Sequence, residues 1–204
     1  MNEEQILKHF WNTCSFDFAH LNIKRNTPGK YFNNLVNKYF DLKGKIILDF
    51  GGGGGYFGKY LFDTFQIGKY IDVDISERNL RFADNILRAY NTELNLNLQQ
   101  SFEQYSADYF FCKAVIHHFP NSNYLNWFLS NLNNTKIKGL YLTIKVCKDQ
   151  DYSFILNSYK KGIKSIGNSC LVNINYIAEQ LTNYELVYEN VGKKNQATII
   201  LMRK

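Results

Sequence analysis

Proline, cysteine and long apolar runs are all scarce in this sequence. Two prolines occur among 204 residues and 45% of the residues are hydrophobic, a globular composition that excludes a disordered chain. There is no run of about 18 uncharged apolar residues, which a membrane-spanning helix would need. The acidic start Met1-Asn2-Glu3-Glu4 is unlike a signal peptide. We therefore expect a cytoplasmic protein that does not bind a membrane.

The four cysteines lie far apart and form no C-x-x-C pair. They are Cys14, Cys112, Cys147 and Cys170. This scatter argues against a zinc site and for a reducing compartment, so we expect no bound metal.

The formal net charge is +6, and the basic residues concentrate late in the chain. The simplest interpretation is a solvated, charged surface. The alternative is attraction of an anionic substrate, such as a phosphorylated metabolite, a nucleotide-linked sugar or RNA. Charge alone does not separate these interpretations.

One glycine-rich stretch organises the rest of the chain. Residues 46–48 are Ile-Ile-Leu and predict a short buried strand of the parallel type. Asp49 closes this strand, and the five glycines at 51–55 predict a bare, tight turn that a ligand can approach closely. Residues 56–65 are expected to form a helix. A ligand above the turn would therefore meet helix N-terminal amides that have no partner within the helix.

Two cofactor-binding patterns fit these glycines. Residues 53–58 satisfy the G-x-G-x-x-G dinucleotide pattern. Residues 49–55 satisfy D-x-G-x-G-x-G, which resembles the first motif of the class I S-adenosylmethionine-dependent methyltransferases. Asp49 favours the second pattern, because its carboxylate would repel a pyrophosphate, whereas S-adenosylmethionine carries an ammonium and a sulfonium group. The resemblance implies that Asp49 receives the amino group of the cofactor. It also implies backbone contacts with the methionine part from Gly51, Gly53 and Gly55.

The segment 69–76 predicts a second strand and a following helix that Ser76 can cap. Asp74 lies about 20 residues beyond the glycines, where nucleotide-binding folds place an acid on the ribose hydroxyls. The Asp-Ile-Ser tripeptide also resembles the methyltransferase motif at this position, which implies cofactor contacts from Asp74 and Ile75. Asp72 is the weaker ribose candidate, because it lies one alternation earlier, where the family usually has a small residue.

A third strand is expected at residues 94–98, after a helix at 77–90. In the family, an acid that binds the adenine amino group often follows this strand. Here the position holds Gln100 and Ser101, so the sequence departs from the pattern. We expect Ser101 and the neighbouring Phe102 to contact the cofactor.

A fourth strand is expected at residues 107–112, and Lys113-Ala-Val-Ile-His-His leaves its carboxyl end. This resembles the fourth motif of the family, a strand followed by a Val-Leu-His-His-like turn, and it implies a cofactor contact from Cys112. Ligands bind outside the carboxyl ends of parallel strands, so Lys113, His117 and His118 are expected on the same rim as the glycines. A hydroxyl acceptor needs a base, and a histidine titrating near neutrality suits that role, so we expect His118 or His117 to act as the base. Lys113 is a candidate ligand for an anionic substrate group.

Two amphipathic helices are expected before the first strand, at residues 3–12 and from Thr27-Pro28 to about residue 39. They resemble the N-terminal cover over the active site of many small-molecule methyltransferases, which implies substrate contacts from Trp11 and Tyr31. The competing interpretation is that their aromatic residues simply pack on the sheet.

The remaining segments complete an α/β fold. A helix is expected at 122–132, a strand at 139–146, a lid or specificity segment at 147–169, a helix at 174–181, and strands at 184–190 and 196–202. The expected architecture is a doubly wound, mostly parallel, seven-stranded Rossmann-like sheet that ends in an antiparallel hairpin. We expect one domain, with a helical cover at 1–43, a cofactor-binding core at 44–146, and the lid and hairpin at 147–204.

The expected function is S-adenosylmethionine-dependent O-methylation of a small polar or anionic metabolite or a sugar-type acceptor. One alternative is methylation of RNA or a protein, although the Asn-Pro-Pro-Tyr-type motif of many such enzymes is missing, so nucleic acid is not favoured. A second is a non-catalytic S-adenosylmethionine-binding protein. A third is an NAD-dependent oxidoreductase, which the terminal hairpin and the short chain disfavour. The sequence specifies neither the acceptor nor the oligomeric state.

Overall fold

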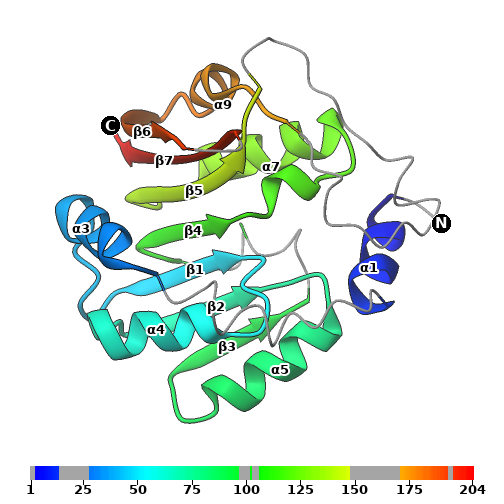
Figure 1. The fold of residues 1–204 in the computed structure, drawn as a ribbon, viewed down its shortest axis with the longest axis vertical. Coiled ribbons are helices and arrows are strands. Elements are labelled where there is room, and N and C mark those ends of the chain that lie inside the picture. Colours follow the sequence, from blue (N-terminus) through cyan, green and yellow to red (C-terminus); the bar gives the residue numbers. More distant parts are fainter. Residues whose placement is uncertain (1–2, 14–27, 97–101, 103–105, 148–170, 193–194) are drawn as a thin grey trace. The chain divides into compact units, whose positions relative to one another are not determined.

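A computed structural model of the chain describes residues 3–13, 28–96, 102, 106–147, 171–192 and 195–204 (Figure 1). The chain divides into two compact units. We call Ser15–Phe111 the loop unit, because it contains the glycine loop (residues 51–55), and Met1–Cys14 with Cys112–Lys204 the hairpin unit. Within the described residues, no helix has the length and apolar character needed to cross a membrane.

The strands form a mixed sheet in the order β3-β2-β1-β4-β5-β7-β6. In the loop unit, β1 (Ile46–Phe50) pairs in parallel with β2 (Lys69–Val73) and with the first residues of β4 (Tyr109–Lys113). β3 (Thr92–Asn95) pairs in parallel with β2. In the hairpin unit, β7 (Gln196–Arg203) is antiparallel to both β5 (Gly139–Lys145) and β6 (Tyr184–Val191). The predicted Rossmann-like sheet with a terminal antiparallel hairpin is confirmed.

Helices join the parallel strands of the loop unit. α4 (Tyr56–Phe65) connects β1 to β2, and α5 (Glu77–Leu87) connects β2 to β3 (Figure 1). In β1 and β2, all residues after the first are buried, as expected for parallel strands covered on both faces. The predicted bounds of α4 are confirmed at both ends.

α3 (Lys30–Tyr39) packs into the aromatic core of the loop unit. The Phe32 ring lies 5.6 Å from that of Phe57 on α4 and 6.4 Å from that of Phe111 on β4. The helix begins later than predicted, because Gly29 is extended and occupies the N-cap position, with no side chain to cap the first turn. Packing on the sheet is therefore one role of this helix. Its role as a cover over the active site stays a prediction.

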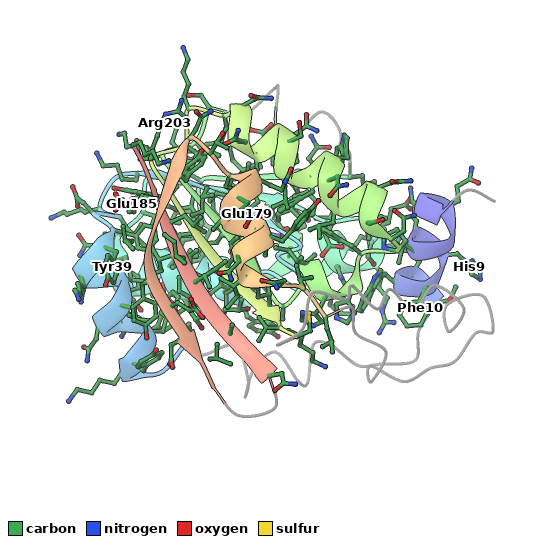
Figure 2. The ribbon with its side chains drawn as sticks, turned by 90° about the horizontal axis from the view of Figure 1, so that it is seen from above. His9, Phe10, Tyr39, Glu179, Glu185 and Arg203 are labelled. Atoms are coloured by element: carbon green, nitrogen blue, oxygen red, sulfur yellow. The ribbon has the colours of Figure 1, made fainter. Side chains whose placement is uncertain are left out.

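The hairpin unit contains α1 (Glu3–Thr13), the short 3₁₀ helix η1 (Ile116–His118), α7 (Ser122–Asn134) and α9 (Ile174–Gln180). α7 begins where the Asn121 side chain accepts a hydrogen bond from the Tyr124 amide at 2.8 Å. Its buried side chains follow helical spacing and are Leu125, Phe128, Leu129 and Leu132. Charged residues such as Glu179 on α9, Glu185 on β6 and Arg203 on β7 are exposed (Figure 2).

The bounds of β3 and the C-terminus of α5 differ from the prediction, since α5 ends at Leu87 and not at residue 90. β3 begins at Thr92, two residues before the predicted start, because Thr92 is the register partner of Tyr70 and Asn91 already accepts a hydrogen bond from the Tyr70 amide. All four β3 residues are half-buried, so the Leu-Asn-Leu alternation did not mark the strand bounds. The predicted lid, with its Lys160–Lys164 cluster, falls outside the described residues except at Cys147.

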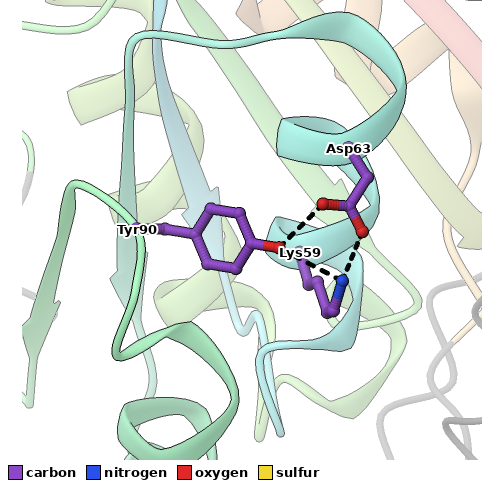
Figure 3. A network of polar contacts seen from close by, with 3 residues as sticks. All are labelled: Lys59, Asp63 and Tyr90. Carbon is purple, nitrogen blue, oxygen red and sulfur yellow. Dashed lines mark hydrogen bonds and ion pairs between the residues drawn. The ribbon is translucent and has the colours of Figure 1, made fainter.

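A surface network connects α4 to Tyr90, in the turn between α5 and β3 (Figure 3). Lys59 donates hydrogen bonds to Asp63 and to the Tyr90 hydroxyl, and this hydroxyl donates to Asp63 at 2.7 Å. Phe62 stacks on Tyr90 with ring centroids 4.7 Å apart. The Lys59 and Asp63 side chains are about half exposed, so solvent screening keeps the contribution of this ion pair to stability small.

Gly58 sets the distance between α4 and β2. A Cβ atom at this position would lie 2.6 Å from Cε1 of the Tyr70 ring, which is itself completely buried. In an open helix Gly→Ala would stabilise by about 0.5–1 kcal/mol. Here we expect Gly58→Ala to lower the free energy of unfolding by about 1–3 kcal/mol, because the methyl group overpacks the helix–sheet contact. Chemical denaturation would measure the difference.

Gly192→Ala is the matched control, since the nearest atom to its added Cβ is 3.5 Å away. We expect little change for this variant. If Gly58→Ala were as stable as the wild type, Tyr70 would not pack against α4 as described.

Candidate functional site

The glycine loop follows β1 and leads directly into α4. Gly51, Gly53 and Gly55 have φ angles of 79°, 66° and 80°, in the left-handed region that favours glycine. The Gly51 amide donates to the Val73 carbonyl at 2.7 Å, which attaches the loop to the end of β2. Gly55 is the N-cap residue of α4. The three predicted glycine positions are therefore the three that need this backbone conformation.

Close approach to neighbouring elements also explains why the loop carries no side chain at Gly52 and at Gly55. A Cβ on Gly52 would lie 2.6 Å from Asp72 Oδ1 and 2.7 Å from the Tyr70 hydroxyl. A Cβ on Gly55 would lie 2.8 Å from the Ala83 Cα on α5. The loop thus rests directly on β2 and α5.

Asp74 lies just after β2 and is 5% exposed. Its Oδ2 accepts a hydrogen bond from the Gly53 amide at 3.0 Å, and its Oδ1 accepts one from the Ser76 amide at 2.7 Å. The Asn79 side-chain amide donates to both oxygens, at 3.3 and 3.2 Å. Asp74 therefore joins the glycine loop to the start of α5.

Asp49 lies in β1 and is 2% exposed. Its Oδ2 accepts a hydrogen bond from the Tyr70 hydroxyl at 2.5 Å. Burial, followed by the nearby carboxylate of Asp49, raises the pKa of Tyr70 well above its usual value, so the phenol stays protonated and acts as the donor.

Asp72 is the register partner of Asp49 in the parallel β1–β2 ladder. It is completely buried, and its Oδ1 accepts a hydrogen bond from the Gly52 amide at 3.1 Å. Burial, then the charges of Asp74 and Asp49, raise the pKa of Asp72 well above its usual value. Burial also raises the pKa of Asp74, against the lowering effect of its hydrogen bonds to Ser76, Asn79 and Gly53.

The carboxyl side chains below the loop therefore form an acidic floor, which we define as Asp49, Asp72 and Asp74. The sequence identified Asp49 and Asp74 as site residues and ranked Asp72 as the weaker candidate for binding the ribose. It did not identify Tyr70 and Asn79, which support the carboxyl groups through hydrogen bonds. The signal for Tyr70 was strand alternation, which places residues 70, 72 and 74 on one face. The signal for Asn79 was helix geometry, since it lies in the first turn after the Ser76 cap.

The residues predicted to surround the adenine are only partly described. Ser101 lies outside the described residues. Phe102 is 8% exposed, and its ring stacks at 5.8 Å on Phe50 and at 6.1 Å on Phe110. Phe102 is thus a packing residue of the loop unit. Ile75 is half-buried between Asp74 and the α5 cap.

The hairpin unit holds the predicted histidines on η1, just after β4. Ala114 lies in the turn between β4 and η1 and has a φ angle of 60°. Its amide donates hydrogen bonds to the carbonyl (3.0 Å) and to the hydroxyl (2.8 Å) of Thr143 on β5. The His117 and His118 rings lie 4.3 Å apart. His117 is 6% exposed, and its Nδ1 has no hydrogen-bond partner among the described residues.

Burial and nearby positive charge keep both imidazoles neutral. Burial, then His118 and Lys145, lower the pKa of His117 to about 3. Burial, then Lys145, lower the pKa of His118 to about 4. Lys145 ends β5 and was not singled out by the sequence, because its proximity to the histidines depends on the pairing of distant segments.

The other predicted site residues fall in both units. Trp11 on α1 contacts His118 edge to face, with ring centroids 5.0 Å apart. Cys112 is completely buried in β4, and Lys113 after it is half-buried. Tyr31 lies on α3 in the loop unit and is 52% exposed. Trp11 is therefore brought to the histidines, whereas Tyr31 belongs to the other unit. Within the described residues, no group of histidine, cysteine and acidic side chains could hold a metal ion.

Comparisons with known proteins point to one family. Residues 48–135 match the family model for a methyltransferase domain. The structure is similar to magnesium protoporphyrin IX methyltransferase from Synechocystis PCC 6803 with bound S-adenosylhomocysteine (TM-score 0.70, 16% identity, 100% of both chains covered). It is also similar to an S-adenosylmethionine-dependent methyltransferase from Clostridium acetobutylicum ATCC 824 (TM-score 0.66, 13% identity, 91% of this chain and 97% of that one).

A third similar structure is the mitomycin 7-O-methyltransferase, with a TM-score of 0.60 and 15% identity, where the match covers 96% of this chain and 60% of that one. At these identities the likeness establishes the fold. No curated protein sequence matches the chain.

The neutral histidines make stability depend on pH. Their folded-state pKa values lie below the usual 6.5, so between about pH 6.5 and 4 the unfolded chain binds protons that the folded chain does not. We therefore expect the free energy of unfolding to fall on acidification through this window, by up to about 1.4 kcal/mol per pH unit for each histidine. Denaturation series at several pH values would measure the slope.

The double variant His117→Asn/His118→Asn should lose most of this slope, whatever its absolute stability. Carbon NMR of the wild-type imidazoles offers an independent measurement, in which both rings should remain neutral at pH 5.5. Protonation of either ring near pH 6.5 would contradict their burial.

Proposed function

We propose that the chain is a class I S-adenosylmethionine-dependent methyltransferase that transfers the methyl group to a hydroxyl of a small anionic acceptor. Two features carry the proposal: the acidic floor under a bare glycine loop in the loop unit, and the neutral side chains of buried His117 and half-buried His118 near Lys145 in the hairpin unit. The first feature suits a cationic donor, and the second suits an acceptor that must lose a proton.

We assign the donor to the loop unit. The backbone of Gly51, Gly53 and Gly55 would bind the methionine part, and Asp49 would receive its ammonium group. Asp74 would bind the ribose hydroxyls, exchanging its hydrogen bonds from Asn79 for those of the ligand while keeping the Gly53 and Ser76 amides. Roles beside the adenine and the sulfur are proposed for Ile75, Ser101, Phe102 and Cys112.

We assign the acceptor to the hairpin unit. His118 or His117 would take the hydroxyl proton, Trp11 would contact the acceptor from α1, and Lys113 would bind an anionic group. Tyr31 remains a proposed contact from α3. A histidine with a pKa of about 3 to 4 is a weak base. Burial is the main cause of these low pKa values, and an acceptor carboxylate or phosphate near Lys145 would offset the smaller part that is due to the lysine charge, which would raise both pKa values.

The transfer itself is a direct displacement. The acceptor oxygen forms a bond to the methyl carbon while the carbon–sulfur bond breaks, the electron pair of that bond remains on sulfur, and the hydroxyl proton passes to the histidine. The protein contributes by aligning the oxygen with the methyl group and the leaving sulfur, and by excluding water.

The acceptor can be identified with the purified protein and methyl-labelled donor. We expect label in small molecules from a cell extract, in the fraction that binds an anion-exchange resin, with the product a methyl ether or ester by mass analysis. Transfer of the label to RNA, with steep loss at higher salt, would instead support the nucleic-acid alternative. Label in protein would support the protein alternative, and the absence of any transfer would support a non-catalytic role.

His118→Asn and His117→Asn distinguish catalysis from binding. Removing the working base should lower kcat by about 10²–10⁴-fold, while the affinity for S-adenosylhomocysteine stays within about twofold. If neither variant loses activity, the histidines are packing residues of the hairpin unit.

Asp74→Ala tests the donor site. The substitution removes the acceptor for Gly53 and the proposed ligand of the ribose, so we expect affinity for S-adenosylhomocysteine to fall by about 10–100-fold, equivalent to about 1.4–2.8 kcal/mol. Asp84→Asn is the matched control, since Asp84 is an exposed acid on α5. Isothermal titration calorimetry would measure both, and an unchanged affinity for Asp74→Ala would exclude the ribose assignment.

A further inference from the structure

Asp72 is a buried carboxyl group that the proposed roles leave unused. It is completely buried in β2 directly below the glycine loop. Its Oδ1 accepts the Gly52 amide at 3.1 Å, and its Oδ2 has no hydrogen-bond partner among the described residues. Because even a Cβ on Gly52 would reach within 2.6 Å of Oδ1, the side chain is the support on which this part of the loop rests.

The ionisable groups that face Asp72 are acidic. Asp49 faces it from β1 as its register partner, and Asp74 and the Tyr70 phenol lie on its own strand face. The loop that covers it contains glycine alone. On the adjacent helices, Lys59 of α4 is paired with Asp63, and Arg78 of α5 lies 6.0 Å over the Phe82 ring beside exposed Glu77. None of these charges is among the causes that shift the pKa of Asp72.

An additional positive charge near the acidic floor is therefore needed if all of its carboxyl groups are to be ionised. Burial and the two neighbouring carboxylates favour the protonated form of Asp72 in the empty protein. A cationic ligand above the loop would favour the carboxylate. The donor of this family brings two positive groups, an ammonium and a sulfonium, whereas its thioether product keeps the ammonium alone.

We propose that Asp72 is a positioning residue of the cofactor site, which supports the glycine loop through Gly52 and carries a proton that it releases to solvent when S-adenosylmethionine binds. This inference rests on the placement of the cofactor at the glycine loop. No electrons move, and the released proton is exchanged for the charge of the ligand. Because S-adenosylhomocysteine lacks the sulfonium charge, its binding releases a smaller fraction of a proton from Asp72. Asp72 thereby favours the substrate over the product of the reaction, and increasingly so as the pH rises.

Calorimetry in two buffers of different ionisation enthalpy, phosphate and Tris at pH 7.5, measures the proton release. We expect the wild-type protein to release a measurable fraction of a proton on binding S-adenosylmethionine and a smaller fraction on binding S-adenosylhomocysteine. Asp72→Asn keeps an oxygen for the Gly52 amide and mimics the protonated side chain. It should bind within about threefold of the wild type at pH 7.5 but lose the proton release. Asp84→Asn should keep it.

Proton release that is absent in the wild type, or unchanged in Asp72→Asn, would overturn the proposal. Should the variant fail to fold, the wild type alone decides: its affinity for S-adenosylmethionine should rise with pH, by up to tenfold per unit, more steeply than that for S-adenosylhomocysteine. Parallel pH profiles would exclude the proposal. Absence of binding heat and of a thermal shift with either ligand would instead reject the cofactor site itself.

Discussion

The contact between the Gly52 backbone and the β2 side chains beneath it is the constraint on which the proposed cofactor site depends. Gly52 rests on Asp72 and on the Tyr70 hydroxyl, at distances that leave no space for a side chain. Its amide is held by Asp72, while the next amide, of Gly53, is held by Asp74. Loop geometry is therefore determined from below by buried carboxyl groups. The lack of side chains at Gly52 and Gly55 follows from these close contacts.

Most of the fold could be predicted from the sequence because its signals are local. Apolar strands, the Ser76 cap and helical spacing on α7 all act over a few residues, and the structure follows them closely. β3 departed from prediction because its bounds depend on pairing with β2, which strand alternation at an exposed edge does not specify. α3 begins later than predicted because its N-cap residue is Gly29, which has no side chain to cap the first turn.

The site was predicted less completely, and for a physical reason. Asp49 and Asp74 belong to sequence motifs, but the supporting residues Asp72, Tyr70 and Asn79 act through contacts across strands and a helix turn. The same holds for Lys145, which acts on the histidines from β5. The pKa values of the histidines were likewise beyond sequence reasoning, because they depend on burial. The two histidines were expected to titrate near neutral pH, but their pKa values of about 3 and about 4 keep them uncharged above about pH 4.

The division of the chain has a consequence for the order in which it folds during synthesis. α1 belongs to the same unit as residues 112–204, and its Trp11 contacts His118, although the entire loop unit separates them in sequence. α1 is therefore synthesised well before the residues that it contacts, whereas the loop unit is a continuous segment that can form its own core beforehand. Such distant contacts slow folding and leave an early apolar surface uncovered. The contact between Trp11 and His118 consequently forms only after η1 has been synthesised.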